Sequence, residues 1–427
     1  MSGWLGFIIV AVNFVIALRK PKVGVWLYLV LIFVIPHSQI AGRSVSYDIL
    51  GFIPLVASVI FVNKGKVKHP NLLYIIAPLY PALMIFSTWI SSTFYGFDIE
   101  PLLLFGVTRF CFLLYIFIET LSEKYIYFAV LFVVFVNLVA CIYQLYFPQE
   151  SIGLFYNLYG KETHAVLRRY YEAGSFARPT GTLLSPVNVG VLVIIAYSIC
   201  IHRIIKIGGD IYKYVSLALI ITTGVVSLTK TALLGVPLLT LLAFLVNFFT
   251  IRPRSISQIG FNTSSIYGYS ILAITLLLVL YSAYNFLQKS GYGYKIIYYI
   301  SFIFDPMEAF ESRYSESGQL GETIDVTLRY PFFGLGATRA QGEFLGDSTL
   351  IRVAHATGIF GLLVHMSIYV YMLYSIIQKS EILKILVLSS LFMSGFALFT
   401  FYTKYGAVVL SYCILSGDSI SSDPYLK

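Results

Sequence analysis

Residues 215–249 read VSLALIITTGVVSLTKTALLGVPLLTLLAFLVNFF, an apolar run with a single charged side chain. A membrane-crossing helix needs about 20 apolar residues, so this run is too long for one crossing and long enough for two. Its charged residue, Lys230, stands near the middle, in the sequence SLTKT at 227–231. We therefore predict a tight hairpin of two transmembrane helices that places Lys230 at a membrane face.

The rest of the chain has the same apolar character. Of its 427 residues 58% are hydrophobic and 11% are charged, and the mean hydropathy is +0.83. A soluble domain of this size has far more charged surface, so the composition predicts an all-α polytopic membrane protein, with 1–427 as one transmembrane domain. The apolar segments do not alternate in period two, which excludes a transmembrane β-barrel. Cytoplasmic loops explain the net charge of +9 better than nucleic acid does.

Twelve apolar segments predict membrane helices, and a short thirteenth near 405–416 is either a crossing or a half-helix. The twelve lie near 4–18, 24–40, 48–62, 71–92, 101–118, 125–147, 183–201, 214–229, 231–250, 269–287, 350–377 and 384–402. Cations follow the first segment rather than precede it, and no small-residue cleavage site is evident. We expect this segment to be a retained helix and not a signal peptide.

The cations between the segments predict the orientation. They form five clusters: Arg19-Lys20 with Lys22; Lys64, Lys66 and Lys68; His202-Arg203 with Lys206 and Lys213; Arg252 with Arg254; and Lys379 with Lys384. The positive-inside rule places all five in the cytoplasm. The alternate loops, among them two long ones at 148–182 and 288–349, then lie outside together with the N-terminus and Lys230. Loops of this length often carry function.

Three helices are predicted to begin at the outer face. Each start has a capping signal and a nearby cation: Ser185-Pro186 with Arg178, Thr229 or Thr231 with Lys230, and Asp347-Ser348 with Arg352. Free backbone N–H groups and the positive end of the helix dipole favour anions there. These starts therefore predict a site for a phosphate or pyrophosphate at the lipid boundary.

Each cation also has a structural interpretation, which the residues leave open. Arg178 can anchor to lipid headgroups, and Lys230 can extend its ammonium out of the hairpin. Arg352 can pair with a carboxylate a few residues earlier. In the second long loop, Arg313 and Arg329 can each pair with a local carboxylate in the same way.

Three further ionisable residues are candidates for function. His355, one turn after Arg352, is either a hydrogen-bonded core residue or a functional group. Asp347 is expected to cap a helix and is a candidate general base, since a carboxylate can take a proton from a hydroxyl. Arg109 falls near the middle of 101–118, where we expect it to face a polar cavity or a lipid-phosphate groove. The sequence has no HExxH and no paired-histidine spacing, so we predict neither metal nor cofactor.

Three groups of short motifs share one stretch, from about residue 170 to 365. They are Arg178-x-x-Gly181 with Pro186-x-Asn188-x-Gly190; Ser227-x-Thr229-Lys230-x-x-x-Leu234-Gly235; and Arg313 followed by Pro331-x-x-Gly334-x-Gly336, Asp347-Ser348 and Gly358-Ile359-x-Gly361. In order, spacing and topology they resemble the bacterial O-antigen polymerase and ligase superfamily. The chain departs from that pattern at Lys230, where arginine is usual, and at Asp347-Ser348, where Asp/His-Asn is usual.

The resemblance implies a GT-C-like, all-helical glycosyltransferase of the bacterial inner membrane, whose site faces the periplasm. Such an enzyme transfers a glycan from undecaprenyl pyrophosphate to an acceptor sugar hydroxyl, without a metal or cofactor. Its partners are the lipid-linked donor and acceptor, membrane lipids and, as a further candidate, a chain-length regulator, but no nucleic acid. From the residues and the resemblance together, we predict that Arg178, Lys230, Arg313 and Arg352 bind the pyrophosphate, with Arg109 and Arg329 as secondary candidates. The predicted catalytic residues are Asp347 and His355.

Other functions stay open. A histidine-rich outer loop would favour an O-antigen ligase, and only His164 lies in an outer loop, so polymerase is favoured. From a different class, the chain could be a transporter of lipid-linked oligosaccharides. The absence of internal repeats and the concentration of charges in outer loops speak against transport. A scaffold for a synthesis complex predicts that polymer is unchanged when Arg178 or Lys230 is replaced by alanine.

Overall fold

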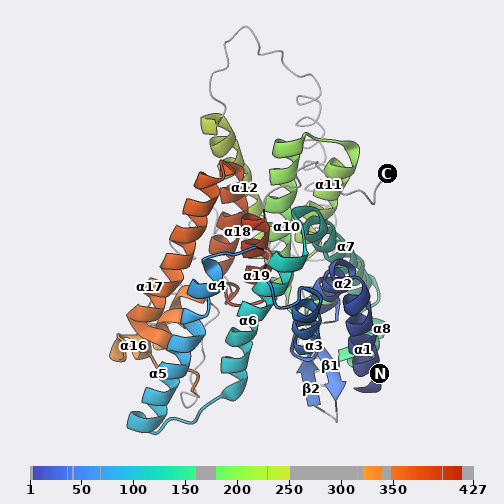
Figure 1. Cartoon of the computed structure of the whole chain (residues 1–427). Coiled ribbons are helices and arrows are strands. Elements are labelled where there is room, and N and C mark those ends of the chain that lie inside the picture. Colours follow the sequence, from blue (N-terminus) through green and yellow to red (C-terminus); the bar gives the residue numbers. More distant parts are fainter. Residues whose placement is uncertain are drawn as a thin grey trace.

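The computed structural model describes residues 3–35, 37–40, 43–67, 69–159, 179–227, 229–250, 315, 321–338, 348–396 and 398–415 (Figure 1). These parts of the chain form a bundle of helices, and the all-α prediction is correct for them apart from one short hairpin. The hairpin pairs β1 (His37–Ile40) with β2 (Arg43–Ser46) in antiparallel fashion. The helix predicted at 24–40 therefore ends earlier, at Val34, and the strand β1 follows it.

Most predicted segments have a counterpart among the remaining helices, whereas one helix, Pro148–Tyr159, lies in the predicted loop 148–182. The first half has α1 (Gly3–Arg19), α2 (Pro21–Val34), α3 (Tyr47–Val62), α4 (Leu73–Ile76), α5 (Leu79–Tyr95), α6 (Pro101–Thr120), α7 (Glu123–Tyr146) and α8 (Pro148–Tyr159). The second half has η1 (Gly181–Leu183), α10 (Pro186–Ile207), α11 (Ile211–Val226), α12 (Lys230–Thr250), α16 (Gly321–Arg329), α17 (Thr349–Gln378), η3 (Ile382–Lys384), α18 (Ile385–Gly395) and α19 (Lys404–Ile414).

Within the described residues, five helical stretches are long and apolar enough to cross a membrane. They are Leu73–Tyr95, Glu123–Tyr146, Pro186–Ile207, Lys230–Asn247 and Thr349–Gln378, and six shorter apolar helices accompany them. These stretches indicate a polytopic membrane protein. The predicted segment 269–287 lies outside the described residues.

The α11–α12 hairpin is as predicted. Helix α11 ends at Val226 and α12 begins at Lys230. The Thr229 hydroxyl oxygen accepts a hydrogen bond of 3.4 Å from the Ala232 amide, so Thr229 caps the second helix.

The last two helices differ from the prediction of one crossing at 384–402. Helix α18 ends at Gly395, residues 398–403 are irregular, and α19 begins at Lys404. The break is held by Thr349, whose hydroxyl donates to the Leu398 carbonyl at 3.0 Å and accepts from the Thr400 amide at 3.1 Å. Helix α19 has 11 residues, which matches the half-helix alternative for 405–416.

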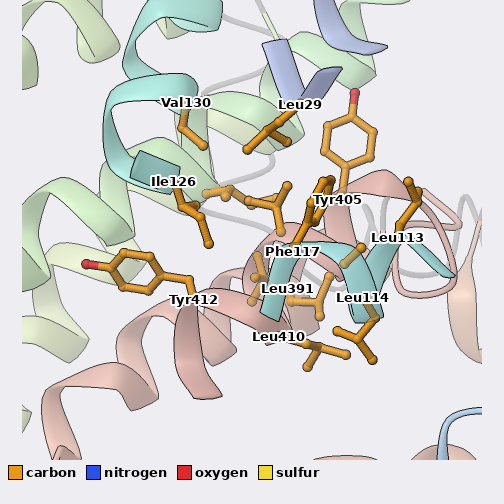
Figure 2. Packing of buried hydrophobic residues seen from close by; sticks show 14 of the residues in the cluster. Leu29, Leu113, Leu114, Phe117, Ile126, Val130, Leu391, Tyr405, Leu410 and Tyr412 are labelled. Atoms are coloured by element: carbon orange, nitrogen blue, oxygen red, sulfur yellow. The ribbon is translucent and has the colours of Figure 1, made fainter. Parts of the chain in front are cut away.

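The core explains why so short a helix is stable. Every residue from Tyr405 to Ile414 is buried. Figure 2 shows side chains of α19 packed with those of α2, α6, α7 and α18, such as Leu29, Phe117, Ile126, Leu391 and Leu410. Because protein surrounds α19, its terminal backbone groups need not face lipid.

Several predicted cation clusters meet at one end of the bundle. The Lys206 ammonium lies 2.8 Å from Glu381 and 3.7 Å from Glu123, and the buried Lys384 ammonium contacts the same two carboxylates. These pairs join the end of α10, the start of α7 and the connection after α17. Lys20 and Lys22 lie near the same point, because they share a cavity with residues 119, 120 and 125. We call this the cation-rich end, and the other the opposite end.

Candidate functional site

Toward the opposite end, residues 331–336 run beside α17 as irregular backbone. The Leu335 amide donates to the His355 carbonyl at 2.7 Å, and the Gly336 amide donates to the Ala356 carbonyl at 2.8 Å. The Ile359 amide donates to the Pro331 carbonyl at 2.8 Å. Helix α17 is interrupted at this level, so the irregular segment takes up hydrogen bonds that a continuous helix would make within itself.

Three glycines make this close approach possible. Gly334, Gly336 and Gly358 have φ angles of 63°, 66° and 62°, in the left-handed region that glycine adopts without strain. A Cβ at Gly336 would lie 2.3 Å from the Thr88 nitrogen, and one at Gly358 would lie 2.2 Å from the Phe332 oxygen. The structure thus gives a physical reason for the Pro331-x-x-Gly334-x-Gly336 motif and for Gly358.

Helix α5 holds the other side of this segment. The Ala337 amide donates to the Thr88 hydroxyl at 2.7 Å, and the Glu100 amide donates to the Ala337 carbonyl at 2.7 Å. Residues 331–338 therefore lie between α5 and α17, both part of candidate membrane spans. Irregular backbone at this depth is tolerated where protein buries it or where it lines a cavity.

A cavity of about 180 Å³ adjoins the irregular segment. Its lining comes from five parts of the chain: Tyr80 and Met84 of α5; Gly106, Val107 and Arg109 of α6; Gly336; Arg352, His355 and Ala356 of α17; and Phe399, Tyr402 and Thr403 before α19. Residues far apart in sequence therefore line one cavity.

The cavity brings together three of the predicted site residues. Arg352 lies in the first turn of α17, and its guanidinium carbon is 5.1 Å from the centre of the Phe399 ring. His355, one turn later, is buried. Arg109 reaches the cavity from α6, about 12 Å along that helix from its start at Pro101. Two guanidinium groups and an imidazole on one cavity suit an anionic ligand.

Aromatic rings form the inner wall of the cavity. The rings of Tyr80 and Tyr402 are stacked, with centroids 3.8 Å apart and planes 8° apart. The Tyr402 hydroxyl is 3.3 Å from Nδ1 of His365, which lies deeper in α17. Neither tyrosine was a sequence candidate, because nothing distinguishes them among the chain's 34 tyrosines.

Lys230 occupies a different place. It is the first residue of α12, is half-buried, and is not among the residues that line the cavity. Its hairpin packs on α10, where a Cβ at Gly190 would lie 2.5 Å from the Thr229 hydroxyl oxygen and 3.2 Å from Cβ of Thr231. The first two motif groups of the resemblance are therefore in contact.

The remaining candidates divide into two classes. Arg329 is exposed and pairs with Asp325, one turn earlier in α16, at 2.6 Å, which is the local pairing that the sequence left open. Arg178, Arg313 and Asp347 lie outside the described residues.

One cation near the cavity was missed by the sequence reasoning. Lys404 begins α19 directly after Thr403, donates to the Ile32 carbonyl at 2.6 Å and lies 4.7 Å from the centre of the Phe33 ring. A lone lysine between two apolar segments was the available signal. The hydrogen bond of Lys404 connects the start of α19 to the end of α2.

Comparison with known proteins does not identify a family. No protein-family model matches the chain, and no curated protein is similar to it. The functional assignment therefore rests on the geometry of the site and on the motifs.

Proposed function

We propose that the chain is a glycosyltransferase of the bacterial inner membrane that polymerises undecaprenyl-pyrophosphate-linked repeat units into O-antigen or a related surface polysaccharide. In this proposal the protein has about 12 to 13 transmembrane helices and two long periplasmic loops, at 148–182 and 288–349. The cation-rich end faces the cytoplasm by the positive-inside rule. The opposite end, with the cavity, then faces the periplasm.

The observation that carries the proposal is the convergence of Arg109, Arg352 and His355 on one cavity. In glycosyl transfer the bond between the anomeric carbon and the pyrophosphate oxygen breaks, and negative charge grows on the leaving group. Arginine binds phosphate oxygens through a planar fork of donors. Cations held in place before the reaction stabilise that growing charge.

The size of the cavity limits what it holds. Pockets that enclose a drug-sized ligand measure about 300–1,000 Å³. The cavity of about 180 Å³ is smaller, so we assign to it the diphosphate and the reacting bond. In this proposal the glycan and the lipid tail extend away from it.

His355 is the described residue best suited to act on the acceptor. It lies one turn from Arg352 on the same cavity. The acceptor hydroxyl oxygen forms the new bond to the anomeric carbon and loses its proton, and a neutral imidazole can take that proton. Asp347, the other candidate base, precedes the same helix. Lys230 and the arginines at 178 and 313 remain proposed contacts for the rest of the donor.

The test is chain growth by the purified protein in detergent, with lipid-linked repeats as the only substrate. We expect wild-type protein and the control Arg19→Ala, an exposed arginine at the cation-rich end, to form a ladder of products. The double variant R109A/R352A should form none while keeping its melting temperature within a few degrees. A transporter would give no ladder with any variant.

A deletion strain separates polymerase from ligase. Surface polysaccharide with single-repeat bands indicates a lost polymerase. Rough core together with accumulated long lipid-linked polymer indicates a lost ligase and would contradict the proposal.

A further inference from the structure

A second cavity, of about 410 Å³, lies at the cation-rich end, far along the bundle from the candidate site. It is formed where three connections meet: the α1–α2 turn with Lys20 and Lys22, the end of α3 with Asn63, and the α6–α7 turn with Glu119 and Thr120. None of these residues has a part in the proposed glycosyl transfer.

Two buried polar groups on this cavity lack a partner within the described parts of the chain. They are Nδ2 of Asn63 and the hydroxyl oxygen of Thr120. Both residues are only 8% exposed, so bulk water does not solvate them freely. Buried donors are nearly always hydrogen-bonded in folded proteins. These two therefore indicate a bound group that supplies acceptor oxygens.

The charges around the cavity indicate what that group is. Lys20 and Lys22 are exposed at its edge, on either side of Pro21, where α2 begins. Ammonium groups beside a helix N-terminus favour a phosphate. Glu119 is buried and lines the same cavity. Its carboxylate is held by the His69 amide at 3.1 Å and the Tyr74 hydroxyl at 2.9 Å, and it favours a cation.

Exposed apolar side chains lie on the elements that form the cavity. Val23 lines the cavity and is 43% exposed, and Ile60 and Phe61, in the last turn of α3 before Asn63, are 44% and 75% exposed. In a membrane protein such exposed apolar surface faces acyl chains. A ligand here can therefore have a charged head in the cavity and an apolar body outside it.

We propose that this cavity binds the headgroup of a phospholipid that carries both a phosphate and a primary ammonium, as phosphatidylethanolamine does. The phosphate oxygens accept from Lys20, Lys22, the Asn63 amide and the Thr120 hydroxyl, and the ammonium donates to Glu119. The lipid belongs to the leaflet at the cation-rich end. This site is independent of the proposed glycosyltransferase activity.

The test is native mass spectrometry of the whole protein in detergent, titrated with lipids one at a time. We expect phosphatidylethanolamine to bind about tenfold more tightly than phosphatidylcholine, whose trimethylated nitrogen cannot donate to Glu119. Soluble phosphoethanolamine should bind more weakly than the lipid, because it lacks the acyl chains. Equal or tighter binding of the soluble compound would overturn the assignment to a lipid.

Variants locate the site. K20A/K22A should bind the lipid about tenfold more weakly. The matched control K64A/K66A removes the same charge from exposed lysines at the same end that do not line the cavity, and should bind normally. Glu119→Gln keeps an acceptor for His69 and Tyr74 but should abolish the preference for ethanolamine over choline.

Three further results would overturn the proposal. One is an equal loss of binding in K20A/K22A and K64A/K66A, which would indicate general attraction to anionic surface. Another is an unchanged headgroup preference in E119Q. The third is unchanged lipid binding in Thr120→Val. This variant removes the hydroxyl at nearly constant side-chain volume, so we expect it to fold normally.

Discussion

The amide of Leu335 donates a hydrogen bond of 2.7 Å to the carbonyl of His355. This bond fixes a glycine-rich segment to the part of α17 that holds two of the cavity's ionisable side chains. Since the next amide, at Gly336, bonds in the same way to Ala356, the segment and the helix are positioned as one unit. A change in the segment should therefore reach the site.

Gly336→Ala tests this coupling. The alanine would be strained at a φ of 66°, which costs about 1–3 kcal/mol, and its Cβ would clash with the Thr88 backbone. We expect a lower melting temperature in detergent and loss of chain growth. Gly153→Ala in α8 is the control, because a Cβ there meets nothing within 4 Å. Normal stability and activity in G336A would contradict the coupling.

Arg109 should contribute through its fork of donors as well as through its charge. We expect Arg109→Ala to lower kcat/KM about a hundredfold, since loss of one preorganised donor at developing charge costs about 3 kcal/mol. Arg109→Lys retains a point charge, so its kcat/KM should lie between those of the wild type and Arg109→Ala. The measurement is the initial rate of chain growth at several donor concentrations. Equal rates for the lysine and alanine variants would show that the positive charge is irrelevant.

His355 has a matched control ten residues along the same helix. His365 is also buried, pairs with the Tyr402 hydroxyl and does not line the cavity. A general base contributes about a hundredfold or more, so under the proposed role of His355 we expect His355→Gln to lower kcat by that factor with little change in KM. His365→Gln should change the melting temperature and leave kcat nearly unaltered. Equal kcat losses in the two variants would favour a packing role for both histidines.

The carboxylate of Glu381 makes stability depend on pH in the acid range. Burial raises its pKa, but the hydrogen bonds and charges of Lys206 and Lys384 outweigh burial and lower the pKa from 4.5 to about 2. The native state therefore holds the ionised form, and its stabilising effect is complete above the unfolded pKa near 4.5. We expect this effect to be lost as the pH falls from 4.5 toward 2.

Thermal unfolding of the purified protein between pH 7 and pH 3 provides the measurement. Glu381→Gln should lower the melting temperature at pH 7 and reduce its decline below pH 4.5. A decline as steep in the variant as in the wild type would assign the pH dependence to other carboxylates.

Contact between α10 and the α11–α12 hairpin can be tested by a double-mutant cycle. Gly190→Ala places a Cβ 2.5 Å from the Thr229 hydroxyl oxygen, and Thr229→Ala removes that oxygen together with the α12 cap. Loss of such a cap costs about 1 kcal/mol. We expect the double variant to be more stable than the sum of the two single effects predicts, because the closest contact, with the hydroxyl oxygen, is gone. Simple additivity would contradict the contact.

Much of the bundle could be predicted from hydrophobicity and charge alone. The helix hairpin at Lys230 and the gathering of cations at one end follow from rules that depend only on local composition. One feature did not follow. Residues 398–403 are mostly apolar yet irregular, and Thr400, Phe401 and Tyr402 among them are buried in the protein. Tertiary contacts such as those of Thr349 decide this, and no local pattern records them.

At the site, the sequence identified candidate charged residues but did not predict which residues they contact. Arg109 stood out because a cation in the middle of an apolar segment needs a polar surrounding. The stacked pair of Tyr80 and Tyr402 did not, since burial and stacking are set by helices distant in sequence. Arg329 shows the opposite case, where a conspicuous charge has a partner one turn away.

The irregular stretch at 331–336 also constrains how the protein is made. The ribosome produces it before α17, so the amides of Leu335 and Gly336 emerge with no carbonyl to bond to. Because an unpaired amide is costly in hydrocarbon, these two amides need water or another partner until α17 is in place. The cavity is therefore complete only once this segment has packed onto α17.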